Sequence, residues 1–600
     1  MSIVSLSKLT LAGLLKERIS VLEQLQALGC LHLVSLIEAA REPENVPPAH
    51  AVDARKALRY LGDVPDKRHQ VRADQDFDMP KAVASILANQ DRLRHAYDER
   101  DDLVQHVEAL VPWGDFRLPD RDALAGRYLW FYIVPERQMH LLDELSLPWQ
   151  VVHKDNRQSW VVVLDRNEPP TDALPVPRAH TGALSLGELY KRLDEAEVEL
   201  EDAVAERQAL TRWIYLMSRH LARAEDHAAL KHAAAQTRVD EELFLVQGWV
   251  PEPAIAAVSS LAERQGLALL LEDPEPADRP PTLLENPEPL AAGQDLVGFY
   301  QMPAYGTWDP SRVVFFSFAF FFAMILSDAG YALVLGLLLA AFWRRLGRSE
   351  TGLRWRKLCS VLVGGSLLWG VLVGSYFGVS LSPESFWGRL KLLDLNDFDT
   401  MTKLSVSIGV LHLVLAHLEQ LALKWGRLAA WANVGWIAAM LGGFAMWLGG
   451  GQGAPHWLSA TGQWALGLGL LAVFVFASER AVRDPRSALF RLLDGLWALT
   501  GVTRIFGDVL SYLRLFALGL ASASLALTFN DLARQASQVQ GMGLLFAILI
   551  LFVGHLLNLM LALMSGVVHG LRLNYIEFYN WALSGEGYAF QPFKKKESLE

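Results

Sequence analysis

Hydrophobic and polar positions divide the chain into two parts of different character. Long apolar stretches recur through residues 311–600; they lie near 313–328, 330–343, 357–380, 403–423, 429–449, 461–478, 503–530 and 543–573. Most are about as long as a bilayer requires, roughly 20 residues. The pattern predicts eight transmembrane helices. The first two are short and meet at a tight turn, "SDAGY", and the last two are long enough to be tilted or bent.

The first part alternates between strand-like and helix-like patterns. Residues 2–36 read as strand, helix and strand, and "RYLWFYIVP" and "SWVVVLD" read as strands around a short helix. Later, "ELFLVQGWVPEP" and "IAAVSSLAERQGLALLLEDP" return the chain to a lobe, and residues 274–310 form a Pro-rich linker. These patterns predict two small α/β lobes.

A coiled coil is the clearest periodic signal in this part. Spacings of four and three join Leu189, Leu193, Ala196, Leu200, Ala203, Arg207, Leu210, Ile214, Met217, Leu221 and Ala224. Such a repeat predicts a long helix, with residues 80–110 as its partner. The predicted fold is therefore mainly α. A coiled-coil arm with two small α/β lobes occupies residues 1–310, and an eight-helix transmembrane domain occupies residues 311–600.

Charge gives the expected orientation. Residues 311–600 carry 23 Lys and Arg against 16 Asp and Glu, whereas residues 1–310 carry 32 against 50. Lys and Arg cluster after the second, fourth, sixth and eighth apolar segments, so the positive-inside rule places both termini in the cytoplasm. Lys8 and Lys16 interrupt any secretory signal, and two cysteines cannot build a disulfide framework.

Arg514 lies deep in the seventh apolar segment, where a charge is costly and therefore points to function. Gly507, Ala517, Ala521 and Thr528 share its helix face. The spacing thus predicts that Arg514 stands alone in a groove of small residues, open to something that passes close by. Arginine keeps its proton, so it can repel cations and attract a carboxylate but cannot shuttle protons.

The eighth segment carries a polar stripe with helical spacing. It runs through His555, Asn558, Ala562, Ser565, His569 and Arg572, with Glu577 just beyond it. In the third segment, small residues repeat every four positions at Ser366, Gly370, Gly374 and Gly378, which favours close helix packing. Two structural readings of the arginines stay open: pairing with buried acids, and snorkelling to the surface.

Several short motifs in the sequence are typical of one protein family. "GWVP", "PPTLLEN" with "PAYGTWDPS", "MILSDAGY", "SYLRLFALGLA" and "HGLRLNYIEFYNW...GEGYAFQPF" occur in this order with these helices. Together they resemble the large membrane stator subunit of V-type and archaeal-type rotary ATPases, called subunit I in bacteria and subunit a in eukaryotes. The similarity covers nearly the whole chain.

The resemblance implies a mechanism and partners. A ring of small membrane subunits, each with a carboxylate, would rotate past Arg514, the match to the family's essential arginine, with Arg572 matching its second arginine. Two aqueous half-channels would load and unload H⁺ or Na⁺. The arm would bind peripheral stalk subunits that connect to the catalytic ATPase head. The resemblance implies a bacterial inner membrane location, with no cofactor, metal or nucleic acid.

Two positions depart from eukaryotic members, because Ser522 stands where they have histidine and Ala562 where they have glutamate. Other polar residues would then line the half-channels; the candidates are Glu419, His412, Asp508, Ser522, His555, Asn558, Ser565, His569 and Glu577. Two alternatives are a membrane scaffold or receptor without an ion path, and a secondary transporter. No GxxxxGK[ST] sequence occurs, so ATP chemistry is expected in partner subunits.

Overall fold

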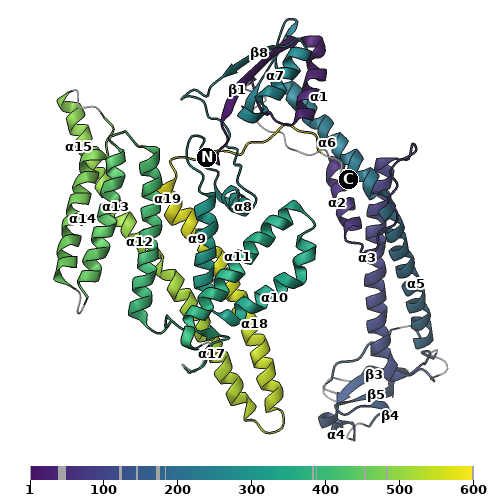
Figure 1. Cartoon of the computed structure of the whole chain (residues 1–600). Coiled ribbons are helices and arrows are strands. Elements are labelled where there is room, and N and C mark those ends of the chain that lie inside the picture. Colours follow the sequence, from purple (N-terminus) through teal and green to yellow (C-terminus); the bar gives the residue numbers. More distant parts are fainter. Residues whose placement is uncertain are drawn as a thin grey trace. The chain divides into compact units, whose positions relative to one another are not determined.

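The structure is a computed structural model that describes residues 2–37, 49–119, 124–143, 146–169, 176–182, 184–380, 384–386, 388–451, 455–480 and 484–596. Its contacts separate two compact units, coloured along the sequence in Figure 1. The first unit contains Met1–Leu14, Cys30–Val34 and Leu243–Pro592. The second contains Leu15–Gly29, Ser35–Glu242 and Phe593–Glu600. The domain division at residue 310 stays a prediction.

A coiled coil forms the main part of the second unit. Helix α3 (Met79–Leu110) packs against α5 (Leu186–Leu210), which confirms the predicted partner. Leu103 and Val107 of α3 share an apolar cluster with Leu189, whereas Asn89 bonds to Ala203, so the two helices run antiparallel. The predicted long helix is interrupted by a 3₁₀ turn, Thr211–Trp213, before α6 (Ile214–Gln236).

Local sequence signals explain where these helices begin. Ser185 caps α5 in a capping box, in which its hydroxyl accepts the N–H of Glu188 and the Glu188 carboxylate accepts the N–H of Ser185. Asp78 accepts the N–H of Lys81 at the start of α3, where Pro80 occupies an early helical position. This unit also contains α1 (Arg18–Leu28), α2 (Ala49–Gly62) and β6 (Arg238–Asp240).

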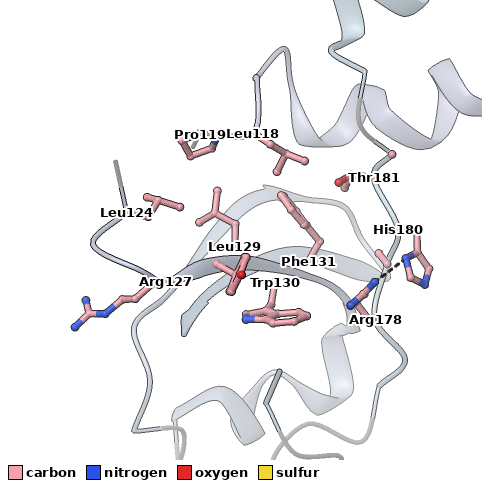
Figure 2. Close-up of a pocket in the computed structure, with 13 residues that line it drawn as sticks. Leu118, Pro119, Leu124, Arg127, Leu129, Trp130, Phe131, Arg178, His180 and Thr181 are labelled. Atoms are coloured by element: carbon pink, nitrogen blue, oxygen red, sulfur yellow. Dashed lines mark hydrogen bonds between the residues drawn. The ribbon is translucent and has the colours of Figure 1, made fainter. Parts of the chain in front are cut away.

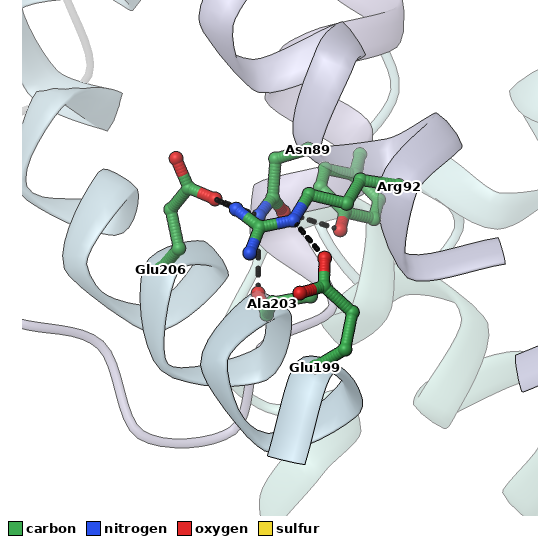
Figure 3. Close-up of polar contacts among 6 residues, drawn as sticks. Asn89, Arg92, Glu199, Ala203 and Glu206 are labelled. Carbon is green, nitrogen blue, oxygen red and sulfur yellow. Dashed lines mark hydrogen bonds and ion pairs between the residues drawn. The ribbon is translucent and has the colours of Figure 1, made fainter. Parts of the chain in front are cut away.

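A polar network interrupts the apolar seam of the coiled coil (Figure 3). Asn89, which is 2% exposed, donates to the Ala203 carbonyl at 3.0 Å and to Glu206 at 2.9 Å, and accepts from the Tyr60 hydroxyl at 2.8 Å. Arg92 reaches both Glu199 and Glu206 from the neighbouring turn. A satisfied buried amide restricts the register of two helices, because other alignments would leave it unpaired.

The second α/β lobe is a three-stranded antiparallel sheet of order β3-β5-β4. Its strands are β3 (Tyr128–Pro135), β4 (Trp149–Lys154) and β5 (Gln158–Asp165), with α4 (His140–Asp143) between β3 and β4. The sequence predicted β3, β5 and the short helix but missed β4. Figure 2 shows a pocket over β3, where the Arg178 guanidinium lies 5.3 Å from the Trp130 ring and bonds to His180.

The strands of the first lobe and helix α7 (Ile255–Arg264) belong to the first unit, whereas its first helix, α1, is part of the second. The strands β1 (Leu6–Leu14), β2 (His32–Val34), β7 (Leu243–Pro251) and β8 (Ala268–Glu272) pair antiparallel in the order β2-β7-β1-β8. Helix α7 connects β7 to β8. Gly248 is required because a Cβ there would lie 2.6 Å from the His32 carbonyl oxygen. The predicted strand and helix segments of this lobe are confirmed.

Apolar helices make up the rest of the first unit. Among the described residues, seven helical segments are long and apolar enough to cross a membrane: Ala329–Leu346, Glu350–Val373, Phe398–Leu423, Ala430–Gly449, His456–Phe476, Pro485–Ser537 and Gly543–Ala582. A shorter apolar helix, α9 (Ser311–Leu326), precedes them. Each of the eight predicted segments therefore corresponds to an apolar helix. The first of them, α9, has 16 residues and is shorter than a bilayer requires.

These segments carry the following labels. They are α10 (Ala329–Leu346), α11 (Glu350–Val373), α12 (Phe398–Leu423), α13 (Ala430–Gly449), α14 (His456–Phe476), α15 (Pro485–Leu499), α16 (Gly501–Ser511), α17 (Leu513–Ser537), α18 (Gly543–Arg572) and α19 (Tyr579–Ala582). A helix α8 (Ala291–Tyr300) precedes α9, and a hairpin of β9 (Ser375–Tyr376) and β10 (Val379–Ser380) follows α11.

One predicted boundary is wrong. Helix α11 ends at Val373, because Gly374 adopts a φ of 74° as its C-cap, so Gly374 and Gly378 do not continue a helical stripe. Gly378 instead lets the hairpin approach α17, since a Cβ there would lie 2.6 Å from the Ala526 Cβ. The basic cluster after the sixth apolar segment includes Arg486 and Arg491, which lie in helix α15 and not in a connecting loop; a capping box at Asp484 begins α15.

The Asn89 network yields a stability prediction. We expect Asn89→Ala to lower the local opening free energy of α3 and α5 by ~1–3 kcal/mol, because the Tyr60 hydroxyl loses its buried acceptor. Hydrogen exchange of the full-length protein, followed by mass spectrometry on peptides from both helices, measures this change. Arg94→Ala is the matched control, because Arg94 is exposed on the same helix. Equal exchange in both variants would contradict the prediction.

Candidate functional site

Arg514 lies at the start of α17, opposite the end of α18. Its Nη2 atom is 3.7 Å from Oε1 of Glu577, so the two side chains form an ion pair without a close hydrogen bond. Arg514 Nη1 and Glu577 Oε2 are buried and form no hydrogen bond with any residue the structure describes. The expectation that Arg514 stands alone is therefore wrong: one of the readings left open, pairing with a buried acid, describes the observed contact.

A π-helical turn positions Glu577. Residues Leu573–Phe578 continue α18 with this wider turn before α19. Such a turn shifts the helix face that later side chains occupy, and π turns are frequent at functional sites. On the helical wheel of a regular α18, Glu577 lies just beyond the end of the polar stripe. The added turn brings its carboxylate to the Arg514 guanidinium.

The small-residue face beside Arg514 is open. Gly507, Ala517, Ala521 and Thr528 are all exposed, and a Cβ at Gly507 would meet nothing within 4 Å. The Arg514 side chain keeps 22% of its area exposed. A cation thus lies at the edge of a surface without bulky side chains, as the sequence predicted. A passing group could approach the guanidinium closely there.

A first polar cluster surrounds this end of α18. His412 Nδ1 lies 2.7 Å from the Tyr512 hydroxyl oxygen, and the imidazole stacks on Phe578 with ring centres 4.3 Å apart. Asp508 Oδ2 accepts the Trp581 indole N–H at 2.7 Å. We call these residues the Arg514-side cluster. Glu419 is half-buried on α12 and forms no ion pair within the described ranges.

A second polar cluster lies further along α17 and α18. His555 Nδ1 lies 2.8 Å from the Tyr331 hydroxyl, and Nε2 lies 3.1 Å from Asn530 Oδ1. Asn558 donates to the Tyr331 hydroxyl at 3.0 Å and to the Ser522 carbonyl at 2.8 Å. The Ser522 hydroxyl donates to Asn558 Oδ1 at 3.3 Å. We call this set the His555-side cluster.

The other stripe residues lie between or beyond these clusters. Ser565 and His569 are half-buried, and His569 Nδ1 forms no hydrogen bond within the described part of the chain. Arg572 is exposed. The stripe predicted along α18 thus joins two clusters of different composition, with Arg514 beside one of them.

Asp328 is a central residue that the sequence reading missed. Its buried carboxylate caps α10 by accepting the Tyr331 N–H, and it also accepts from the Ser375 hydroxyl and the N–H groups of Phe377 and Gly378. It therefore ties the α9–α10 turn to the β9–β10 hairpin. An Asp just before a helical apolar run is an N-cap signal that could have drawn attention to it.

Comparison with known proteins covers this same region. Residues 506–595, which include Arg514, Arg572 and Glu577, match the V-type ATPase 116kDa subunit family. The chain is therefore similar to this family over its last membrane-spanning segment and the residues on either side of it. It is 29% identical to V-type ATP synthase subunit I of Chlamydia trachomatis over 86% of this chain and 89% of that protein. It is 27% identical to V-type ATP synthase subunit I 1 of Treponema pallidum over 99% of this chain and 100% of that protein.

An archaeal relative and one solved structure are also similar to this chain. The A-type ATP synthase subunit I of Pyrococcus horikoshii is 27% identical over 60% of this chain and 55% of that protein. A crystal structure of the cytoplasmic N-terminal domain of subunit I, homolog of subunit a, of V-ATPase is similar with a TM-score of 0.24 and 17% identity. It covers 44% of this chain and 99% of that chain. The long apolar helices of the described residues, together with the similarity to this family, indicate a multi-pass membrane protein.

Asp328 gives a testable prediction. Asp328→Ala leaves buried donors of the β9–β10 hairpin unpaired, at a cost of ~1–3 kcal/mol for each unsatisfied group. We expect a lower unfolding temperature of the purified protein in detergent and faster exchange of the hairpin amides. Asp399→Ala is the control, because Asp399 is exposed and forms its ion pair with Lys403, four residues away on the same helix. An unchanged unfolding temperature would exclude this role.

Proposed function

We propose that this chain is the ion-translocating stator subunit of a V/A-type rotary ATPase. A rotor ring of small subunits would pass the open face of α17, and each ring carboxylate would approach Arg514 in its ionised form. The observation that carries the proposal is a partly exposed arginine at the edge of an open, small-residue face among membrane-spanning helices. Residues 506–595, which hold this face, are the ones that match the family.

The electrostatics favour ion release at this position. Two unit charges ~4 Å apart attract by about 4 kcal/mol at an effective dielectric constant of ~20. A ring carboxylate beside Arg514 would therefore lose its H⁺ or Na⁺ more readily than elsewhere in the membrane. The same fixed charge would repel a cation that moved directly between the two sides. Glu577 would hold the guanidinium in place between successive carboxylates, because its 3.7 Å contact is loose enough to exchange.

The two polar clusters support two separate half-channels. Arg514 and Ser522 are eight residues apart on α17, which is ~12 Å along a helix. The Arg514-side cluster, with its polar residues Asp508 and His412, would line one half-channel together with Glu577 and Glu419. The His555-side cluster would line the other, with Ser522, His555 and Asn558. Ser565, His569 and Arg572 would line the space between them.

The coiled coil supports the second part of the proposed function, which is binding to peripheral stalk subunits. An antiparallel pair of helices resists bending, and α3 is 32 residues long, or about 48 Å. We propose that it binds peripheral stalk subunits, which connect it to the catalytic head where ATP is made or hydrolysed. The scaffold alternative would need no charge beside the open face. A secondary transporter would need no coiled coil.

Substitution of Arg514 tests the ion path. We expect Arg514→Ala to reduce ATP-driven ion uptake by about a hundredfold or more, since ~2.7 kcal/mol of lost stabilisation already has that effect. Arg514→Lys should also lose most uptake, because lysine lacks the planar fork and loses its proton more readily. Uptake is measured in vesicles that hold the assembled complex.

Arg534→Ala is the matched control for this experiment, because Arg534 lies on the same helix and is exposed beside Asp531. It should leave uptake unchanged. If Arg514→Ala assembles and still transports ions at the rate of the unmodified complex, the stator-arginine proposal is wrong and the scaffold alternative replaces it.

Membrane orientation is a separate prediction. Loop charge places residues 344–357 in the cytoplasm and residues 385–400 on the other side. Single cysteines introduced as Ser349→Cys and Ser385→Cys, in a chain whose native Cys30 and Cys359 are replaced, should react with a membrane-impermeant reagent from opposite sides. Reaction of both from one side of intact membranes would contradict the proposed orientation.

A further inference from the structure

The segment that follows the last membrane-spanning helix forms backbone hydrogen bonds with residues 282 and 302. Within the first unit, the Gly587 N–H donates to the Met302 carbonyl at 3.0 Å. The Thr282 N–H donates to the Tyr588 carbonyl at 2.8 Å, and the Phe590 N–H donates to the Thr282 carbonyl at 3.0 Å. Residues 585–592 are therefore bound along their backbone rather than left free, and we call them the C-terminal strap.

Glycines let the strap make this path. Gly585 adopts a φ of 125°, which favours glycine. A Cβ at Gly587 would lie 2.3 Å from the Pro303 carbonyl oxygen, too close for any other residue without a shift of the backbone. The sequence "GEG" thus has a structural reason beyond chain flexibility: it allows the strap to turn and to lie against residues 303–304.

His32 of β2 receives the end of the strap. The Gln591 N–H donates to His32 Nδ1 at 2.9 Å. Two strap rings lie around the imidazole, with ring centres 5.7 Å away for Tyr588 and 5.5 Å for Phe590. The Tyr588 hydroxyl donates to the Arg279 carbonyl at 2.9 Å. A side chain of the lobe and the segment that follows α19 are therefore joined by a directional contact.

We propose that residues 585–592 form a releasable strap that fastens the first lobe to the end of the last membrane-spanning segment, with neutral His32 as the acceptor that holds it closed. Most strap residues are exposed and none is buried, so opening the strap requires no disruption of a core. This inference goes beyond the proposed function, since strap docking is a property of the resting protein. Its mechanical consequence is that the lobe and α18 would move together while the strap is closed.

The chemistry of the contact predicts its pH dependence. Nδ1 accepts a hydrogen bond only while it carries no proton, and an imidazolium has no acceptor. Burial lowers the pKa of His32 below its ordinary value of 6.5, so the imidazole is neutral at neutral pH. The strap contact is therefore fully present above about pH 6.5. It weakens as the pH falls through the lowered pKa of the docked state.

Neighbouring groups leave His32 as the titrating residue. Among the strap side chains, burial raises the pKa of Tyr588, which keeps its proton throughout this range. In the sheet, His32 lies opposite Trp249 on the neighbouring strand. Trp249 in turn lies opposite Lys8, and Lys8 lies opposite Glu272. Lys8 is paired with Asp278 at 3.0 Å, which offsets its charge.

Hydrogen exchange of the full-length protein in lipid nanodiscs tests the strap directly. Exchange is measured without ATP on peptides that cover residues 583–592 and corrected for the intrinsic pH dependence of exchange. We expect protection of the unmodified strap to fall by up to about tenfold between pH 7.5 and pH 5.5, equivalent to the loss of one hydrogen bond. Protection that is the same at both pH values would overturn the inference.

Two substitutions of the same residue separate acceptor from charge. His32→Asn places an amide oxygen near the position of Nδ1 and does not titrate, so the strap should be equally protected at both pH values. His32→Phe keeps a ring but has no acceptor, so the strap should be poorly protected at both. A protected strap in His32→Phe at pH 7.5, or a pH-dependent strap in His32→Asn, would contradict the role of His32.

A further variant distinguishes loss of the strap contact from misfolding of the lobe. Gln591→Pro removes the donor N–H and leaves β2 intact, and it should lower strap protection as His32→Phe does. Exchange of α7 reports on the lobe itself and should not change. Because the measurement needs no transport, Arg514→Ala should leave strap protection unchanged. Failure of the strap and failure of the proposed ion path are thus distinguishable.

Discussion

Polar groups between membrane-spanning helices must find partners inside the chain, because the bilayer core offers none. This constraint explains the contacts that organise the first unit. Asp328 satisfies donors from two loops that are about fifty residues apart in sequence, with a separation of 50 between Asp328 and Gly378. Asn558 connects α18 both to Tyr331 and to α17. Each polar side chain therefore fixes helices that apolar packing alone would leave free to slide.

Arg514 departs from this rule in an informative way. Its partner Glu577 lies at 3.7 Å rather than at hydrogen-bond distance, and one guanidinium nitrogen forms no hydrogen bond among the described residues. A buried amide such as Asn558 is fully paired nearby. Polar residues such as Asn558 therefore hold the helices in their arrangement. Arg514 instead retains a hydrogen-bonding group for another partner, as expected at the edge of an open face.

The same distinction applies outside the membrane-spanning segments. In the coiled coil, Asn89 is buried and bonded on every side, so its network holds one register permanently. In the C-terminal strap, hydrogen bonds lie on an exposed segment and one of them ends on a titratable ring. Exposed contacts open with small free-energy cost, so the strap is suited to release and the Asn89 network is not.

Much of the architecture follows from the sequence alone. Apolar length and periodicity located the eight apolar segments, the coiled coil and most strands of the two lobes, with β4 as an exception, because these patterns reflect burial of one face or of a whole helix. A single charge in an apolar helix marked Arg514, and helical spacing collected the polar stripe of α18. The order of short motifs indicated the family that residues 506–595 match.

Tertiary structure decided what each polar residue contacts. The π-helical turn that brings Glu577 to Arg514 changes the helical phase, which a regular wheel does not include. The role of Asp328 depends on a hairpin far along the chain, and the end of α11 depends on a positive φ at Gly374. The strap joins Gln591 to His32 across a separation of 559 residues. Such contacts arise from how distant segments pack, and local periodicity carries no information about that packing.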